Sequence, residues 1–218
     1  MNSRITTYTL LVALLFSLLV LTQRVGGFRL PGNQQGYEPV QPIAYSHRLH
    51  AGELQIDCVY CHTGVETSRH AGIPPAATCM NCHRFVTATW GAVRAEGDIA
   101  KEEGRKPETI VSSEIAKVYT AMALDKTGQQ RDPNAEPAPI AWTKVHNLPD
   151  FAYFDHRAHV NAGVVCQSCH GPVETMERVR QFEDLSMGWC VNCHRQSNAT
   201  GVKGKAVHAS IDCATCHY

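Results

Sequence analysis

All ten cysteines of this 218-residue chain lie in five copies of one pentad, Cys-x-x-Cys-His, and no other feature limits the fold as strongly. In c-type haem attachment the two thiols form thioethers with the porphyrin, and the next histidine binds the iron as proximal ligand. We therefore expect five covalent haems that occupy much of the interior. The expected attachment residues are Cys58, Cys61, Cys79, Cys82, Cys166, Cys169, Cys190, Cys193, Cys213 and Cys216, and the expected proximal ligands are His62, His83, His170, His194 and His217.

Cys-x-x-Cys pairs also occur in zinc ribbons and in redox dithiols, so both are alternatives. Histidine makes up only 12 of the 218 residues, yet it follows all five pairs. Zinc ribbons use such pairs two at a time, and five is an odd number. The pattern favours haem.

The balance of charge narrows the function classes. Lys plus Arg and Asp plus Glu each number 20, so no basic field indicates nucleic acid as a partner. Aromatic residues are only 7% of the chain, which is low for a domain that fills its own core, and haem macrocycles can replace them. No cysteine remains for a structural disulfide or a thiol nucleophile.

The N-terminal stretch is apolar. Residues 5–23 carry no charge between Arg4 and Arg24, and such a stretch spans about 28 Å as a helix, close to a bilayer core. A secretory signal peptide has a similar pattern, but no Ala-x-Ala-like cleavage site follows. We expect a transmembrane anchor at residues 1–25 and an extended linker rich in Gly and Pro at 26–44. Because haem is attached outside the cytoplasmic membrane, we expect the haem domain on the periplasmic side of the cell membrane.

The haem region contains an internal repeat. Residues 45–50 precede the first pentad and residues 154–159 precede the third, and both carry an aromatic residue followed by His-x-x-His. Each unit then reaches a second pentad that ends Asn-Cys-His-Arg. We expect a di-haem module at 45–84, a haem-free insertion at 85–150 and a tri-haem module at 151–218.

The insertion is expected to contain one short helix. Ser113 can cap it, apolar residues recur at helical spacing from Ile115 to Met122, and Gly128 would end it. Such an insertion would pack against the haem core or offer a surface to a partner subunit.

The second unit resembles the tri-haem cytochrome c7 and tetra-haem cytochrome c3 group, on Phe154-x-His156-x-x-His159 followed by three pentads. The resemblance implies a class III multihaem cytochrome c with short helices and little regular secondary structure. In that group the first histidine of the pair serves the haem that follows, the second serves the next haem, and a residue just ahead of the second pentad serves the third. The implied axial pairs are His47 with His62, His50 with His83, His156 with His170, His159 with His194, and Met187 with His217.

Met187 departs from that group, which offers histidine at this place. Bis-histidine ligation favours ferric iron, whereas a thioether favours ferrous iron and raises the potential. His70 and Met176 are spare candidates for ligands, while His146 and His208 are expected to contact haem propionates or solvent.

The whole chain resembles the pentahaem cytochrome subunit of alternative complex III. The resemblance rests on the single N-terminal span, the arrangement of two and then three haems, and the stretches at residues 142–151 and 187–190. It implies an electron-relay subunit of a quinol-oxidising membrane complex, without substrate chemistry of its own. The implied partners are an iron–sulfur subunit, polytopic quinol-binding subunits, a mono-haem cytochrome subunit and a soluble periplasmic acceptor or an oxidase.

Two other functions are open at this point. A stand-alone quinol dehydrogenase of the NapC and NrfH type also has one span and four or five haems, but its first haem follows the membrane helix closely, whereas here about thirty-five residues separate Leu21 from Cys58. A multihaem reductase needs an open iron position and usually a pentad that ends in lysine, and all five pentads here end in histidine.

Overall fold

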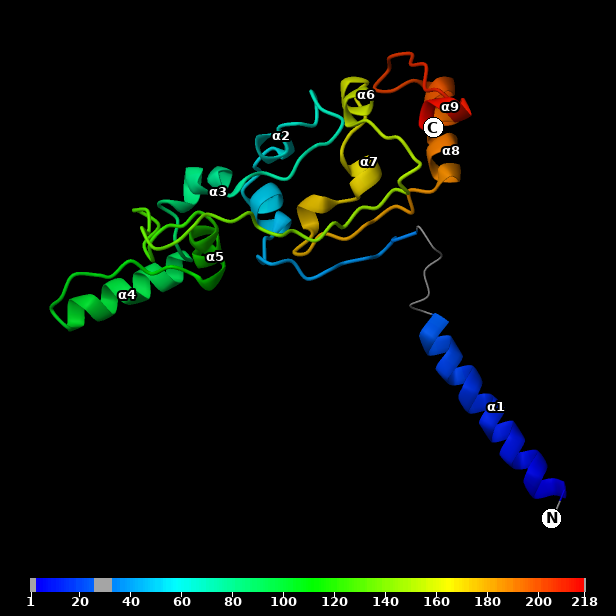
Figure 1. Ribbon diagram of the computed structural model, residues 1–218, viewed down its shortest axis with the longest axis horizontal. Coiled ribbons are helices and arrows are strands. Elements are labelled where there is room, and N and C mark those ends of the chain that lie inside the picture. The colour runs from blue at the N-terminus through cyan, green and yellow to red at the C-terminus, as the bar shows by residue number, and fades with distance from the viewer. Residues whose placement is uncertain (1–2, 26–32, 218) are drawn as a thin grey trace.

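The computed structural model describes residues 3–25 and 33–217, and within them helices alternate with long loops and no β-strand forms (Figure 1). The helices in chain order are α1 (Ser3–Val25), the π-helix η1 (Arg48–Glu53), α2 (Cys58–Cys61), α3 (Ala76–His83), α4 (Trp90–Glu102), α5 (Ser113–Ala121), α6 (His156–Asn161), α7 (Gln167–His170), the 3-10 helix η2 (Val173–Thr175), α8 (Met187–Thr200) and α9 (Cys213–Cys216). Short helices and little regular structure are what the sequence predicted.

The helix α1 packs against nothing else in the described structure. All of its side chains from Arg4 to Leu21 are exposed, and this stretch has a mean hydropathy of 2.0, which makes it long and apolar enough to cross a membrane. The hydroxyls of Thr9 and Ser17 donate to carbonyls one turn earlier, so these polar groups are satisfied within the helix.

The described part of the expected linker, residues 33–44, is extended and lies along the haem domain (Figure 1). Gln41 exchanges two side-chain hydrogen bonds of 2.9 Å with the backbone of Thr143. The backbone amides of Gly36 and Gln181 donate to the carbonyls of Gln181 and Tyr37 respectively. These residues therefore belong to the packed domain, while residues 26–32 lie outside the described structure.

The two His-x-x-His modules hold each other reciprocally. The amide of Arg48 in the first module donates to the Met176 carbonyl of the second at 2.9 Å, and the amide of His156 in the second donates to the Arg69 carbonyl of the first at 3.2 Å. Each donor lies in a His-x-x-His turn, and each acceptor lies in the loop after the other module's first pentad. The helices η1 and η2 pack together at this junction.

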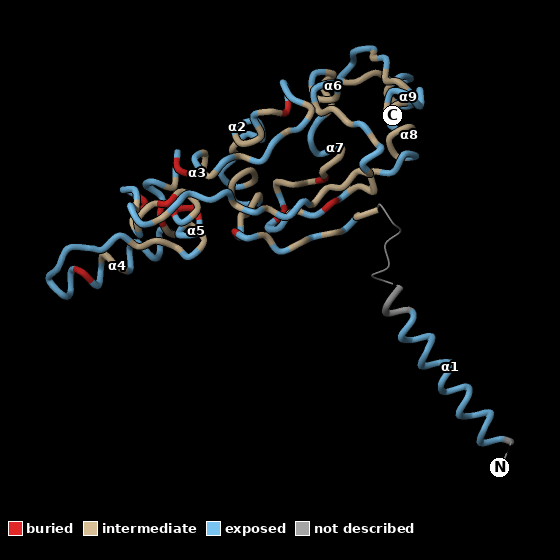
Figure 2. The backbone as a smooth tube through the Cα atoms, in the orientation of Figure 1, coloured by how far each residue is buried: buried red, intermediate tan, exposed pale blue. Residues whose placement is uncertain are grey.

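The apolar core is small and lies at one end of the body. Ile43, Met80, Val118 and Tyr119 form it where α5 packs on α3, and Figure 2 shows buried residues concentrated in this region. Tyr119 is only 2% exposed, and its hydroxyl donates to the His83 carbonyl at 2.5 Å. The insertion is thereby fixed onto the second pentad.

The backbone of residue 128 lies directly against the Tyr119 ring, which a glycine permits. The φ of Gly128 is 71°, and a Cβ at this position would lie 2.4 Å from the ring of Tyr119. A side chain here would both strain the backbone and displace the ring. Gly128 therefore packs in a later turn and does not end the helix, which finishes at Ala121.

The insertion contains two helices where the sequence predicted one. Ser112 rather than Ser113 caps α5, because its hydroxyl accepts from the amide of Ile115 at 3.3 Å. The second helix, α4, begins after Thr89, whose hydroxyl accepts from the amide of Ala92. The few apolar residues of α4 lie at helical spacing, but two glycines and several charged residues lower its helix propensity and its apolar content, so the sequence prediction missed it.

Candidate haem-binding sites

Each cysteine pair lies in or at the start of a helical turn. The i, i+3 spacing places both thiols on the same side of that turn, as attachment to one porphyrin requires. Side chains fix where three of these turns begin: Asp57 accepts from the Val59 amide, Ser186 from the Trp189 amide and Asp212 from the Ala214 amide. None of the ten cysteines, all of which the structure describes, forms a disulfide.

Backbone carbonyls orient four of the five expected proximal histidines. The Nδ1 atoms of His62, His83, His194 and His217 lie 2.6, 2.7, 2.5 and 3.2 Å from the carbonyl oxygens of Gly72, Val86, Ser210 and Phe151. A carbonyl can only accept, so each Nδ1 carries the proton and each Nε2 keeps its lone pair. This is the tautomer that a metal-binding imidazole needs.

Backbone carbonyls also orient three of the expected distal histidines. The Nδ1 atoms of His50, His156 and His159 lie 2.8, 2.9 and 2.9 Å from the carbonyl oxygens of Ser46, Arg69 and Asp155. His47 differs, because its Nδ1 is buried without a hydrogen-bond partner among the described residues.

Three of the expected axial pairs face each other. The ring centroids are 6.1 Å apart for His50 and His83, 6.4 Å for His156 and His170, and 5.9 Å for His159 and His194. Two metal–nitrogen bonds of about 2 Å, with the ring radius added at each end, place two such centroids about 6 Å apart. These rings therefore fit a single iron between them, and haem at these pentads fits the residues present.

The other two expected pairs are less closely defined. Burial, and after it the charge of His62, lowers the pKa of His47 to about 4, and the pairing of His47 with His62 stays a prediction. Met187 is the first residue of α8 and is 69% exposed. One turn later, burial and then the Cys216 thiol raise the pKa of Cys190, so this end of α8 lies beside the fifth pentad. Met187 as the ligand opposite His217 stays a prediction.

The aromatic residue ahead of each His-x-x-His turn contacts both of its histidines. Tyr45 lies edge-on to His47 at 4.9 Å and stacks on His50 at 4.4 Å. Phe154 lies edge-on to His156 at 4.9 Å and stacks on His159 at 4.6 Å. The sequence repeat thus recurs in three dimensions and includes an aromatic support for the ligands.

Burial keeps several of these imidazoles neutral. It lowers the pKa of His170 to about 3, with His146, His156 and His62 as the next causes, and it is also the main cause of the lowered pKa of His159. A metal binds the neutral imidazole. The environment therefore favours the ligand form at neutral pH.

Sequence reasoning missed the role of His146. Its Nε2 lies 3.1 Å from Nδ1 of His170, and the two rings meet edge-on with centroids 4.3 Å apart. We expected His146 at a propionate or in solvent, but it is partly buried against a proximal ligand, and burial followed by the charge of His156 lowers its pKa to about 4. The one signal in the sequence was that residues 142–151 carried a family resemblance.

The pentads follow an order in space that differs from their order in the chain. After burial, a thiol of another pentad helps to raise the pKa in four cross-pentad pairs: Cys61 with Cys82, Cys58 with Cys166, Cys169 with Cys193, and Cys190 with Cys216. The pentads therefore form a row in the order second, first, third, fourth and fifth. Figure 1 shows the corresponding helices in this order, from α3 at one end to α9 at the other.

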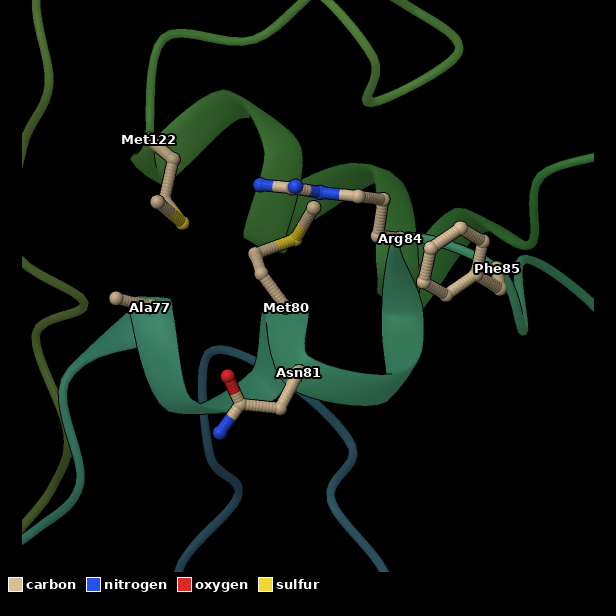
Figure 3. Close-up of a pocket in the computed structure, with 6 residues that line it drawn as sticks. All are labelled: Ala77, Met80, Asn81, Arg84, Phe85 and Met122. Atoms are coloured by element: carbon tan, nitrogen blue, oxygen red, sulfur yellow. The ribbon is translucent and has the colours of Figure 1, made fainter.

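A pocket of about 300 Å³ lies between α3 and the end of α5. Its lining residues are Ala77, Met80, Asn81, Arg84, Phe85 and Met122. Figure 3 shows the thioethers of Met80 and Met122 directed toward the same space, with the Arg84 guanidinium above it. No imidazole lines this pocket, although Met80 and Asn81 belong to the second pentad.

The zinc alternative lacks a suitable site. Within residues 3–25 and 33–217, no group of three or more His, Cys, Asp or Glu side chains is arranged to hold a metal ion. A structural zinc site needs four such ligands.

Comparison with known proteins identifies the class. Residues 152–218 match the family model described as cytochrome c7 and related cytochrome c. This segment is a cytochrome c7-like multihaem domain, which confirms the predicted fold class and the predicted c-type haem.

A relative matches over a greater length. The protein named menaquinone reductase, multiheme cytochrome c subunit, from Nitratidesulfovibrio vulgaris, is 24% identical over 197 residues, which cover 81% of this chain and 76% of the relative. The chain is similar to this subunit over most of its length, and the cytochrome c7-like multihaem domain forms its C-terminal part.

Proposed function

We propose that the chain is an electron-relay subunit with five c-type haems in a membrane complex that exchanges electrons with quinones. The observation that carries this proposal is the facing of imidazoles in three pairs at 5.9–6.4 Å. Two protein ligands on an iron leave no open position for a substrate, whereas bound haem iron of this kind supplies one-electron transfer. The protein's task is then to hold, space and tune the haems.

The row of pentads supports this relay. Thiols of successive pentads in the row lie close enough to affect each other's pKa, so no pentad is isolated from its neighbours. The ends of the row are the second pentad, beside the insertion, and the fifth pentad, at α9. We assign Met187 to the fifth iron, and a thioether there would make this end the one of highest potential. The fifth haem is therefore our candidate for delivery to the acceptor.

The partners follow from the resemblance and from the relative. The name of the relative is that of a subunit of a menaquinone reductase, which supports a quinone-linked complex. We assign the chain to an assembly of the alternative complex III type. It would dock with an iron–sulfur subunit, polytopic quinol-binding subunits and a mono-haem cytochrome, and it would deliver electrons to a soluble periplasmic carrier or an oxidase.

The helix α1 supports a single-pass anchor. It is apolar and exposed from Arg4 to Leu21, and we assign the body to the periplasmic side because covalent haem attachment takes place outside the cytoplasmic membrane. A signal sequence would have the same length and composition, and fractionation separates the two. Anchored protein stays with the membrane until detergent is added, whereas recovery of the chain in the soluble periplasmic fraction would identify a signal sequence.

Purification of the chain from its native membrane tests the function. Mass spectrometry should identify iron–sulfur and polytopic subunits in stable proportion to it. The isolated chain should accept electrons from a reductant but should not oxidise a menaquinol analogue. A saturable, inhibitor-sensitive oxidation by the isolated chain would instead support a quinol dehydrogenase of the NapC and NrfH type, for which the single span of α1 is the favouring observation.

A further inference from the structure

We propose that His146 is a positioning residue that holds the proximal ligand His170 and lowers the potential of the third haem. Its Nε2 lies 3.1 Å from Nδ1 of His170, and the ring planes meet at 88°. This geometry directs the edge of one ring at the nitrogen of the other. The proposal rests on the proposed binding of haem at the third pentad.

The direction of the hydrogen bond follows from the facing pair. His170 lies parallel to His156, with an interplanar angle of 2° and centroids 6.4 Å apart, and because its Nδ1 contacts His146, its Nε2 is the atom left for iron. Its Nδ1 then carries the proton and donates. A neutral imidazole has one donor and one acceptor nitrogen. The Nε2 of His146 is therefore the acceptor and its own proton lies on Nδ1.

The third pentad differs from the other four in the group that lies next to Nδ1 of its expected proximal histidine. His62, His83, His194 and His217 all have a backbone carbonyl next to Nδ1. Among the five expected proximal ligands, His170 is the one whose Nδ1 meets a side chain. The acceptor at this pentad can consequently be removed by substitution, while the acceptors at the other four cannot.

A buried glutamine fixes the segment that carries His146. Gln181 is fully buried, its Oε1 accepts from the Asn147 amide at 3.0 Å, and its Nε2 donates to the Glu183 carbonyl at 3.0 Å. This hydrogen bond fixes the backbone of Asn147, the residue next to His146. The haem-free insertion thus starts at the second pentad and its far end reaches the pentad in the middle of the row.

The chemical consequence is a more basic ligand. An imidazole that donates its Nδ1 proton to an acceptor places more electron density on Nε2, and such second-shell partners strengthen metal ligation. A stronger donor favours ferric over ferrous iron. Loss of the acceptor should therefore raise the potential of the third haem, and an amide acceptor at the same position should preserve it.

The experiment compares two substitutions in the full-length protein purified from membranes. His146→Leu removes the acceptor with little change in volume, and His146→Gln supplies a carbonyl oxygen. Potentiometric titration followed by optical and EPR spectroscopy should show one of five midpoint potentials raised in His146→Leu. We expect up to a tenfold change in the ratio of ferrous to ferric iron, which is about 59 mV for a one-electron couple. His146→Gln should move the same haem by less than half as much, and Lys144→Leu, at an exposed position of the same segment, should move none.

Three results would overturn the inference. In the first, all five potentials stay unchanged in His146→Leu. In the second, both His146 variants shift the same haem equally, which would indicate packing rather than a hydrogen bond. In the third, a high-spin haem appears in His146→Leu, which would make His146 an iron ligand. If His146→Leu does not accumulate, His146→Met makes the same comparison.

Haem counting separates this inference from the proposed function. Peptide mass spectrometry of the unmodified protein should find haem on Cys166 and Cys169. Absence of haem there would refute the proposed function, whereas five haems with unmoved potentials would refute the role of His146 alone.

Discussion

The turn at residues 47–50 and the turn at residues 156–159 share a motif and a ring geometry but differ in how their histidines are supported. In both, an aromatic ring lies edge-on to the first histidine and stacks on the second. In the second turn the Nδ1 of His156 meets the Arg69 carbonyl, while the Nδ1 of His47 is buried without a partner in the described structure.

The proximal ligands opposite these turns differ in a similar way. His62 is oriented by the carbonyl of Gly72, and His170 by the imidazole of His146. The comparison teaches that the motif brings the expected ligands together, whereas residues outside the motif determine how firmly each imidazole is held. Four predictions test this difference.

Loss of one haem is the largest expected effect. The unmodified chain should give five haems per chain in a pyridine haemochrome assay. Replacement of Cys166 and Cys169 by serine should reduce the count to four and also destabilise the junction between the modules. The same change at Cys213 and Cys216, at the end of the row, should reduce the count to four and leave the other haems unaltered.

Mass spectrometry and thermal unfolding distinguish these outcomes. A count of four or fewer in the unmodified chain would contradict the assignment of every pentad. Equal unfolding temperatures for the two double variants would contradict the central position of the third pentad.

Gly52→Ala should disrupt the reciprocal junction. A Cβ on Gly52 would lie 2.3 Å from the Glu174 carbonyl oxygen, so the backbone of η1 or η2 must move. We expect a loss of about 1–3 kcal/mol in the free energy of unfolding, as for other overpacked sites. Gly91→Ala on α4 is the matched control, because nothing lies within 4 Å of its Cβ position, and it should stabilise the helix by about 0.5–1 kcal/mol. Urea titration measures both, and equal effects would show that the junction is not tightly packed.

Met187→His should lower the highest of the five potentials while all five haems are retained. A thioether favours ferrous iron, and its replacement by imidazole should change the ferrous-to-ferric ratio more than tenfold, or by more than about 59 mV. The near-infrared methionine–iron band should disappear. If this band were absent from the unmodified protein, or vanished only when Met176 was replaced, the assignment of Met187 would be wrong.

Arg69→Ala should weaken the support of His156 by a smaller amount. The Arg69 Nε donates to the Phe154 carbonyl at 3.0 Å, and its guanidinium lies 4.3 Å from the Tyr153 ring centroid. Loss of both contacts should cost about 1–2 kcal/mol in the free energy of unfolding. Arg48→Ala, which removes exposed ion pairs with Glu53 and Glu177, should cost less. A larger loss of unfolding free energy in Arg48→Ala than in Arg69→Ala would contradict this prediction.

Short-range patterns predicted the fold class and the haem chemistry well. The pentads and the His-x-x-His pairs bring their own residues close along the chain, and the apolar run at the N-terminus forms the helix α1. The facing of His159 and His194, for example, follows from a family pattern that could be carried over residue by residue.

Contacts between distant segments could not be predicted in the same way. The bond between His146 and His170 joins residues 24 positions apart, and the contact of Cys58 with Cys166 depends on how two modules dock. Neither has a periodic or local signal. The helix α4 was missed for a different reason, since Gly91 and Gly97 lower its helix propensity and it contains more charged than large apolar residues.

The reciprocal contacts between the modules have the form of an isologous interface, in which one patch meets its own counterpart across a two-fold axis. Gly52 lies against the carbonyl of Glu174, and Asn161, its counterpart in the repeat, donates to the carbonyl of Glu66 at 3.5 Å. Two copies of a single di-haem unit would make these contacts as a homodimer. Joined in one polypeptide, the halves can accept different substitutions. An insertion follows the first half and a C-terminal extension follows the second, so the two ends of the chain differ, as the proposed directional electron flow would require.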